Sequence, residues 1–240
     1  MFDTAAPTYT QFSTAQQALF TRVLPTYPTR APDQILDIGC GTGVNTLKLH
    51  SRYTQSIITG VDQSSQMIDQ ARKYAAPIRW QIASAETYTH PDRVDFISSH
   101  GTLHWLTGPI APIIRKNLAP HGGFNIHMFG PETYTELHQA LRICWPQRTP
   151  LPNTPFRTVD DYVRDLRPEF GPLVIDHTRL SVAYPSITDL LKTIKYTGTS
   201  MATARGLWTP RRLSALAETY CRHFGGIWAT HSLISIRNYD

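Results

Sequence analysis

The sequence predicts an α/β fold: a Rossmann-like, doubly wound and mostly parallel sheet with an N-terminal helical lid and an insertion after the fifth strand. Three observations predict it. Short apolar runs alternate with helix-period segments between residues 34 and 130, a glycine-rich turn follows the first run, and an acidic residue ends the second. Such alternation implies a parallel sheet with helices on both faces. The 240 residues, 41% of them hydrophobic, suffice for one large domain over 1–240.

Residues 1–33 precede the predicted sheet and are expected to form the lid. Residues 11–24 carry apolar side chains at the spacing of one helix face, including Phe12, Leu19 and Val23. A proline-rich turn then separates this predicted helix from the sheet.

The segment 34–130 is expected to form the core of the sheet. Its predicted strands are short, apolar and bounded by turn residues, and they lie over 34–40, 56–62, 93–100 and 122–129. The segments between them repeat apolar residues with a helical period, at 44–52, 65–75 and 109–118. A helix between successive strands is the connection that a parallel pair requires.

The alternation stops at Pro131. A helix is expected over 132–143, after which residues 144–172 are rich in proline and show no clear period. Because long segments of this kind commonly serve as binding lids, we expect 131–172 to form the insertion. Residues 173–240 should complete the sheet as strand, helix, helix and strand, at 173–184, 187–196, 209–224 and 227–237.

The stretch ILDIGCGTG, which ends the first strand and opens the first helix of the core, is the most informative part of the sequence. Its Gly39, Gly41 and Gly43 let the backbone turn sharply and let a ligand approach where a Cβ would collide. Asp62 lies nineteen residues after Gly43, at the end of the next strand, where a carboxylate accepts hydrogen bonds from both hydroxyls of a ribose. Together they predict an adenosine-containing ligand at the carboxyl ends of the strands.

The spacing of the glycines separates two kinds of ligand. A dinucleotide fingerprint reads G-x-G-x-x-G, whereas this chain has Asp37 followed by G-x-G-x-G. This arrangement resembles motif I of the class I S-adenosylmethionine-dependent methyltransferases. The family's D-x-S-x-x-M-x-x-x-A is matched from Asp62 to Ala71, residues 83–86 fall on its adenine-edge motif, and 96–100 fall on its motif IV. A dinucleotide dehydrogenase is the alternative.

The resemblance covers the core and implies S-adenosylmethionine as the cofactor, with S-adenosylhomocysteine as the product. Two positions depart from the family pattern. Ser84 replaces the usual adenine-binding aspartate, so this contact is weaker or moves to Glu86 or a backbone amide. His100 stands where many relatives have Asn or Ser, and a structural role for it is equally open. By resemblance, the cofactor-binding residues are Tyr9, Gln16, Asp37, Gly39, Gly41, Gly43, Asp62, Gln63, Met67, Ser84, Ala85, Glu86 and His100.

Segments outside the core resemble the malonyl-acyl-carrier-protein O-methyltransferases of biotin synthesis. The opening F-D-x-A-A-x-x-Y followed by Gln16 matches that family, as do His104-Trp105 and the E-L-H-Q-A of 136–140. Further matches extend the resemblance over about 1–237. Such enzymes methylate the free carboxylate of a malonyl thioester on acyl carrier protein, and the resemblance implies this acceptor here.

The chemistry of this acceptor points to the residues that would act on it. A carboxylate with a pKa of about 4 is ionised at pH 7, so no general base is needed. Catalysis then consists mainly of alignment and electrostatics. The candidate catalytic residues are Tyr9 and Trp105, whose ring faces attract a methyl-sulfonium cation, and Lys195, which would hold the carboxylate. Arg142 is the alternative cation. Plain packing of the two rings, and a solvated position of the lysine on the surface, stay open as alternatives.

The charge is distributed unevenly along the chain. Residues 1–140 hold ten basic and ten acidic side chains, whereas 141–240 hold thirteen and eight, so the entire formal charge of +5 lies in the second part. A local positive field attracts acidic partners, and the resemblance implies acyl carrier protein bearing a malonyl thioester. A solvated surface without a partner is the alternative. The candidate docking residues are Arg142, Lys192, Lys195, Arg205, Arg211 and Arg212.

Features that the sequence lacks disfavour other function classes. The basic segment has no clustered aromatic platforms and motif IV has no Asp-Pro-Pro-Tyr tetrad, so we expect no nucleic-acid partner. No apolar run approaches about 18 residues and no leader pattern opens the chain, so we expect a cytoplasmic monomer without membrane association. Three cysteines, and ten histidines without ligand spacing, predict no metal site. Two alternative functions remain: a small-molecule carboxylate methyltransferase of the trans-aconitate type, and a non-catalytic S-adenosylmethionine-binding protein.

Overall fold

The computed structural model describes residues 2–146, 156–197 and 208–239. Its centre is a seven-stranded sheet with the order β3-β2-β1-β4-β5-β7-β6, in which β7 is antiparallel to its neighbours and the other strands are parallel to one another. The predicted α/β class is confirmed. The strand order reverses between β1 and β4, and such a switch point leaves a crevice where ligands bind. The strands are β1 (Gln34–Ile38), β2 (Ile57–Asp62), β3 (Arg79–Ile82), β4 (Val94–His100), β5 (Leu118–Phe129), β6 (Val174–Ala183) and β7 (Trp228–Arg237).

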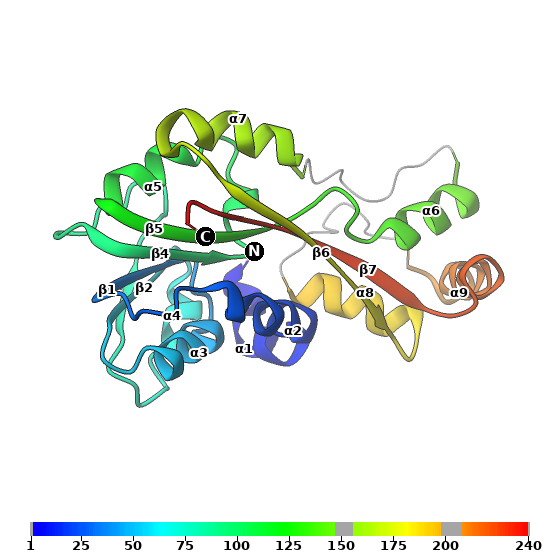
Figure 1. Ribbon diagram of the computed structural model, residues 1–240. Helices are drawn as coiled ribbons and strands as arrows, with labels where there is room; N and C mark the ends of the chain where they lie inside the picture. The colour runs from blue at the N-terminus through cyan, green and yellow to red at the C-terminus, as the bar shows by residue number, and fades with distance from the viewer. Residues whose placement is uncertain (1, 147–155, 198–207, 240) are drawn as a thin grey trace.

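Helices cover both faces of the sheet (Figure 1). α5 and α7 lie on one face, and α2, α3 and α4 lie on the other. Two short 3₁₀ helices, η1 (Leu24–Thr26) and η2 (Leu103–Trp105), follow α2 and β4. The α-helices are α1 (Phe2–Phe12), α2 (Thr14–Val23), α3 (Val44–Arg52), α4 (Ser65–Ala71), α5 (Ala111–Asn117), α6 (Thr135–Cys144), α7 (Val159–Phe170), α8 (Ile187–Tyr196) and α9 (Pro210–Phe224).

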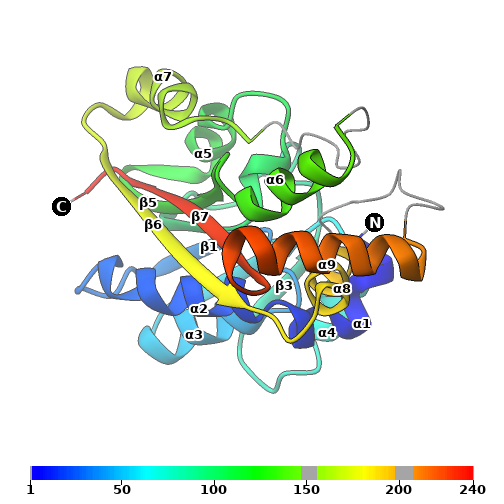
Figure 2. The same cartoon turned by 90° about the vertical axis from the view of Figure 1, so that its right-hand side faces the viewer.

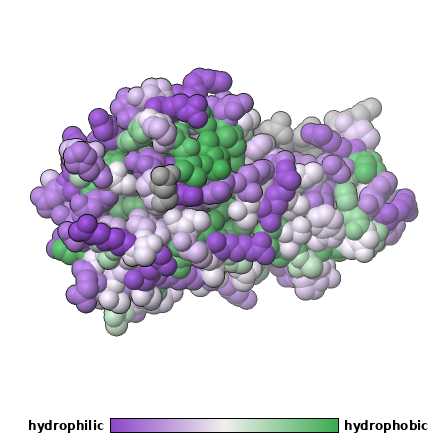
Figure 3. Space-filling view, in the orientation of Figure 1, coloured by the Kyte–Doolittle hydropathy of each residue, from purple (hydrophilic) through white to green (hydrophobic). Residues whose placement is uncertain are grey.

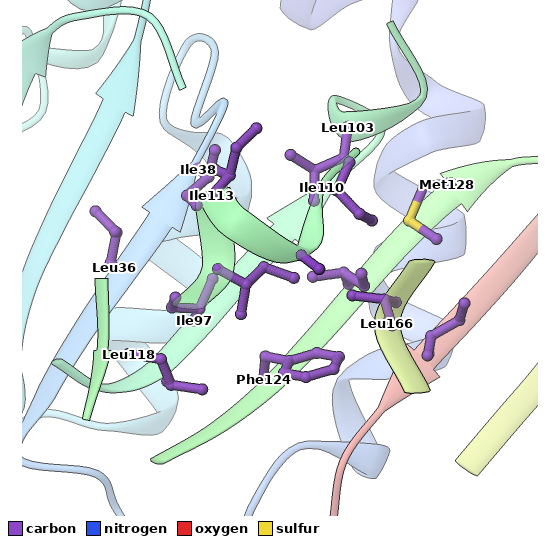
Figure 4. Close-up of a cluster of buried hydrophobic side chains, with 14 of the residues drawn as sticks. Leu36, Ile38, Ile97, Leu103, Ile110, Ile113, Leu118, Phe124, Met128 and Leu166 are labelled. Atoms are coloured by element: carbon purple, nitrogen blue, oxygen red, sulfur yellow. The ribbon is translucent and has the colours of Figure 1, made fainter. Parts of the chain in front are cut away.

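The two faces of the sheet carry separate hydrophobic clusters, because successive side chains of a strand point to opposite sides. On β1, Leu36 and Ile38 belong to the cluster beneath α5 and α7, whereas Ile35 belongs to the cluster beneath α2 and α3. Figure 4 shows the first cluster, where Phe124 of β5 and Leu166 of α7 are fully buried. Packing on both faces holds β1 and β4, and with them the loops at their carboxyl ends.

A third cluster joins α6, α8 and α9 around the end of β7, where these helices lie beside β6 and β7 (Figures 1 and 2). Leu137, Leu190 and Leu216, one from each helix, are fully buried in it. α8 also packs against α1, where the rings of Phe12 and Tyr196 stack with their centres 4.7 Å apart. Because α6 follows the carboxyl end of β5, this helical cap lies at the same end of the sheet as the switch-point crevice.

The N-terminal region and one strand differ from the sequence-based expectation. The helices α3 and α8 have the bounds that their periodicity predicts. The single helix expected over 11–24 is instead two helices that break at Ser13, and α1 was missed because it contains Pro7 and few large apolar side chains. β3 was also missed: it has four residues at the sheet edge and exposes Ile82, so it shows no apolar run.

The expectation of an aperiodic lid over 144–172 is wrong where the structure describes that segment. Residues 159–170 form the helix α7, whose Tyr162 and Leu166 are fully buried against the sheet. Thr158 begins this helix with a capping box to Asp161. The many surrounding prolines, including Pro168 inside the last turn, hid the helical period. Residues 147–155 of the expected insertion lie outside the described part of the chain.

The surface in Figure 3 is hydrophilic over most of the view, with an apolar area between α7 and the edge strand β6. Within the described ranges, no helix is both long and apolar enough to cross a membrane. In the same ranges, His, Cys, Asp and Glu side chains form no group of three or more that could hold a metal ion.

Candidate active site

A cavity lies at the switch point, at the carboxyl ends of β1, β2 and β4. The space between its lining residues, open solvent included, is about 670 Å³. The helix α1 closes one side of the cavity, and the segments that follow β1, β2, β3 and β4 form the rest. Its lining residues are Phe2, Tyr9, Gly39, Gly41, Asp62, Gln63, Met67, Ser84, Ala85, His100, Gly101, Thr102, Trp105 and Leu106.

Two glycines in the turn after β1 are needed for different physical reasons. Gly39 and Gly41 both have a positive φ, which side chains rarely adopt. A Cβ on Gly39 would lie 2.1 Å from Oγ1 of Thr102, so this glycine permits close packing of the two loops. A Cβ on Gly41 would meet nothing within 4 Å and would project into open space. Gly41 is thus the position where bare backbone borders the cavity.

Asp62 organises the floor of the cavity. Its Oδ2 accepts a hydrogen bond from the backbone N–H of Gly41 and its Oδ1 accepts one from that of Ser64, each at 2.9 Å. Burial raises the pKa of this carboxyl, while the two N–H groups counteract the rise. Each carboxylate oxygen has a further lone pair, so Asp62 can hold the glycine turn and still accept hydrogen bonds from a ligand.

Tyr9 and Trp105 bring two aromatic rings to the lining of the cavity. Burial, together with the negative charge of Asp62, raises the pKa of Tyr9 to about 12 and keeps its hydroxyl protonated. The ring of Phe2 packs edge-on against Trp105 with centres 5.8 Å apart. α1 is tied down by a hydrogen bond of 2.9 Å between the hydroxyls of Thr10 and Thr42. The N-terminal helix therefore contributes an aromatic wall.

Four predicted cofactor residues do not line this cavity: Gln16, which lines a second cavity, and Asp37, Gly43 and Glu86. Asp37 is buried behind the turn, where it accepts a 2.6 Å hydrogen bond from the hydroxyl of Thr46, and burial raises its pKa to about 6. Gly43 packs against the ring of Trp80. Glu86 is exposed and accepts a hydrogen bond from the hydroxyl of Ser84. The structure gives the last three residues supporting positions, with Asp37 anchoring α3 to the end of β1.

A second, narrower cavity adjoins the first. The two share Phe2, Tyr9, Gly101 and Trp105. The other described lining residues of the second cavity are Gln16, His104, Phe129, Thr133, Tyr134, Phe156 and Thr197. Gln16, predicted to bind the cofactor, lines the second cavity rather than the first, and it also lines a separate recess beside the glycine turn, together with Gly39 and Gly41.

Two histidines border the cavities in their neutral form. Burial lowers the pKa of His100 to about 4 and that of His104 to about 3. Nε2 of His100 lies 3.1 Å from the carbonyl oxygen of Gln16 and donates to it, which ties the end of β4 to α2. The sequence singled out His100, and the structure gives it both a structural bond and a position in the lining.

Tyr134 was missed by the sequence analysis. It has a φ of 61°, which is uncommon for a bulky residue and marks a backbone held against its preference. Hydrogen bonds to Thr230 hold this backbone in place. The backbone N–H of Tyr134 donates to the carbonyl of Thr230 at 2.8 Å. The buried carboxylate of Glu136 in turn accepts from the N–H and the hydroxyl of Thr230. The E-L-H-Q-A stretch thus positions Tyr134 against the second cavity. No local sequence signal indicates a residue that is set by a contact almost a hundred positions away.

The predicted cations do not come to the cavities. Lys192 and Lys195 are exposed on α8, where the ammonium of Lys195 lies 5.2 Å from the ring centre of Tyr196. Arg142 is exposed on α6, and the guanidinium of Arg212 lies 6.0 Å from the ring centre of Trp145. Arg205 lies outside the described residues. Among the residues described, no lysine or arginine lines either cavity.

Comparisons with known proteins identify the family. A family model described as a methyltransferase domain matches residues 35–122. The chain is 30% identical to the malonyl-[acyl-carrier protein] O-methyltransferase of Anoxybacillus flavithermus, over 98% of this chain and 93% of that protein. This chain belongs to the S-adenosylmethionine-dependent O-methyltransferases. The family resemblance predicted from the motifs is confirmed.

Two other proteins are similar to this methyltransferase. It is 26% identical to the trans-aconitate 2-methyltransferase of Pseudomonas paraeruginosa, over 67% of this chain and 63% of that protein. The solved structure of phosphoethanolamine N-methyltransferase 2 from Haemonchus contortus in complex with S-adenosyl-L-methionine has a TM-score of 0.58 at 15% identity, and the match covers 98% of this chain and 56% of that one. This likeness concerns the fold alone.

We expect Gly41→Ala to separate folding of this methyltransferase from cofactor binding. The left-handed backbone at Gly41 should cost about 1 kcal/mol in the free energy of unfolding once a side chain is added. S-adenosylhomocysteine should bind about tenfold more weakly, because the new methyl group occupies space beside the ligand. Urea unfolding and calorimetric titration measure the two effects. Unchanged affinity would show that the ligand does not approach this backbone.

Proposed function

We propose that this enzyme methylates the free carboxylate of a malonyl group carried on acyl carrier protein, forming the malonyl methyl ester that starts pimeloyl and biotin synthesis. The observation that carries the proposal is the second cavity, which adjoins the first and shares Tyr9 and Trp105 with it, so that an acceptor bound there would lie beside a bound cofactor. The near full-length similarity to a malonyl-acyl-carrier-protein methyltransferase supports this acceptor.

The first cavity fits S-adenosylmethionine. Asp62 offers the acceptor oxygens that two ribose hydroxyls require, and Gly41 leaves backbone bare where a Cβ would stand. The side chains of Ser84 and Ala85 are near enough to border an adenine, and the rings of Tyr9 and Trp105 suit a sulfonium cation. We propose that these residues hold the cofactor, with Gln63, Met67 and His100 completing its surroundings.

The chemistry matches the side chains around the second cavity. When bound, the cofactor supplies a methyl group on a positively charged sulfur, which a carboxylate oxygen takes up without any proton transfer. The acceptor then loses its negative charge. A cavity walled by aromatic rings and neutral polar groups excludes water and favours a reaction that removes charge. A general base is therefore unnecessary, and the residues of the cavity act by alignment.

The helical cap of α6, α8 and α9 is the proposed docking surface for the carrier. Arg142, Lys192, Lys195 and Arg211 are exposed on these three helices. Acyl carrier protein is acidic, and complementary charge raises the rate of encounter more than it adds to affinity. Because exposed charges are screened by salt, the apparent affinity for the carrier should fall with ionic strength.

We expect the double charge reversal Arg211→Glu with Arg212→Glu to raise the KM for malonyl-acyl carrier protein about tenfold at low salt, because both charges then repel the carrier. The affinity for S-adenosylhomocysteine should not change, since α9 does not line the first cavity. Arg93→Glu, which reverses an exposed charge just before β4, serves as the control. An unchanged KM would refute docking on the cap.

Intact-protein mass spectrometry tests the proposed function directly. Malonyl-acyl carrier protein is incubated with the enzyme and S-adenosylmethionine, with acetyl-acyl carrier protein in parallel. The proposal requires a gain of one methyl group on the malonyl form alone. No gain, together with confirmed cofactor binding, would reject this acceptor.

A small carboxylic acid is the second candidate acceptor, and the similarity to a trans-aconitate methyltransferase favours it. Binding of such a small acid would not require a basic docking surface. Turnover of a free acid at a rate matching the carrier substrate would select this candidate, and the charge reversal on α9 would then leave the KM unchanged.

A further inference from the structure

Two buried polar side chains without a partner border the second cavity. Gln16 is 8% exposed and His104 is 6% exposed. Oε1 of Gln16 and Nδ1 of His104 have no hydrogen-bond partner within the described part of the protein. Buried polar atoms are rarely left unpaired in folded proteins, because each unpaired group loses its hydration without compensation. Two of them at one cavity are placed to meet a polar group of a ligand.

Packing holds the ring of His104 in position, and a hydrogen bond fixes the backbone of Gln16. His104 is surrounded by the rings of Trp105, Phe129 and Phe156, with centres 4.9, 5.4 and 5.6 Å away. The backbone of Gln16 is fixed by its carbonyl, which accepts from His100. The His104 ring does not need to move to meet a ligand. Gln16 needs only a half-turn of its amide, which brings Nε2 to the position of Oε1.

Among the described residues, those that line the second cavity carry no full charge. Its described lining contains no Lys, Arg, Asp or Glu. A cation bound to the acceptor carboxylate would stabilise the charged ground state more than the transition state, in which that charge is disappearing. Neutral donors orient the carboxylate without this disadvantage. The physical requirement of the reaction and the composition of the cavity therefore agree.

We propose that the amide of Gln16 and the neutral imidazole of His104 hold the acceptor carboxylate by hydrogen bonds, in place of the lysine or arginine expected from the sequence. This inference rests on the proposed carboxylate methylation. One carboxylate oxygen forms the new bond to the methyl carbon with its lone pair, the bond between that carbon and sulfur breaks, and its electron pair stays on sulfur. No proton moves, so both side chains remain donors throughout and act as positioning residues for the acceptor.

Gln16→Glu and His104→Phe test the inference. The first replaces an amide by a carboxylate of the same shape, and the second keeps a ring but removes the donor. Gln11→Glu, which makes the same charge change at an exposed position on α1, is the matched control. His104→Gln restores a donor. Calorimetry with enzyme saturated by S-adenosylhomocysteine measures the Kd for malonyl-acyl carrier protein, and a separate titration measures the Kd for S-adenosylhomocysteine.

Gln16→Glu and His104→Phe should each raise the Kd for the malonyl carrier about tenfold or more, as expected for a lost bond to a charged group. Gln11→Glu should leave it unchanged, His104→Gln should stay within about threefold of wild type, and the Kd for S-adenosylhomocysteine should not move. An unchanged carrier Kd in both variants, with an active wild type, overturns this inference alone. If wild type methylates only a free acid, that acid replaces the carrier in the titrations. If wild type binds no carboxylate, the proposed function and this inference both fail.

Discussion

The protein is expected to lose stability steeply as the pH falls from about 6.5 to about 4. Burial lowers the pKa of His100 and His231 to about 4 and that of His104 to about 3, and it holds the pKa of His127 well below its usual range. All four are therefore neutral in the folded protein over most of this range, and His100 and His231 take up a proton only near its lower end. In the unfolded chain each takes up a proton near pH 6.5, so acid shifts the equilibrium toward unfolding.

The expected loss is several kcal/mol. Each histidine contributes on the order of 1–3 kcal/mol, which is present above about pH 6.5 and lost as the pH falls toward the folded pKa. Asp37 acts in the opposite direction, because its pKa of about 6 in the folded state lies above that of the unfolded chain. Acid therefore stabilises the fold through Asp37 while it destabilises through the histidines. Asp62, whose pKa burial also raises, acts in the same direction as Asp37. The four histidines outweigh the two carboxyls, so the net effect is destabilisation.

Urea unfolding between pH 7.5 and pH 5 measures this effect. His231→Gln should reduce the pH dependence, because one buried imidazole is removed while a side chain remains to bond with the Tyr184 hydroxyl, which lies 3.2 Å from Nε2 of His231. His121→Gln changes an exposed histidine and should leave the pH dependence as in wild type. A free energy of unfolding that stays constant from pH 7.5 to pH 5 would contradict the expectation.

The second large effect is expected at Asp62. Asp62→Ala should weaken S-adenosylhomocysteine binding by about 1–3 kcal/mol, which is between about fivefold and about 150-fold in Kd. The ribose hydroxyls lose their acceptor, and the N–H groups of Gly41 and Ser64 lose theirs, so the glycine turn is also released. Asp62→Asn keeps one acceptor oxygen and should lie between wild type and the alanine variant.

Calorimetric titration with S-adenosylhomocysteine measures the change at Asp62, and urea unfolding records any loss of stability beside it. Asp69→Asn is the matched control, because Asp69 is exposed on α4 and pairs only at the surface with Arg72, at 3.5 Å. An unchanged affinity in Asp62→Ala would remove the central evidence for where the ribose binds.

Local sequence patterns predicted much of the fold. The run from β1 through the glycine turn into α3 follows from apolar periodicity and from backbone conformations that only glycine adopts readily. The same is true of α8, whose amphipathic period has the observed bounds. α7 was missed because proline masks a period that packing nevertheless realises through Tyr162 and Leu166.

The motifs, and with them the methyltransferase family and its cofactor, were therefore determined by the sequence alone. Only the tertiary structure decided which side chains meet at the cavities: it moved Asp37 behind the turn, left Lys195 on the surface, and brought Tyr134 and Gln16 beside His104. The physical reason is the separation along the chain over which each kind of interaction acts. Periodicity and turn preference act over a few residues, whereas a cavity is lined by segments about a hundred positions apart that meet only because α1, η2 and α6 pack at one end of the sheet.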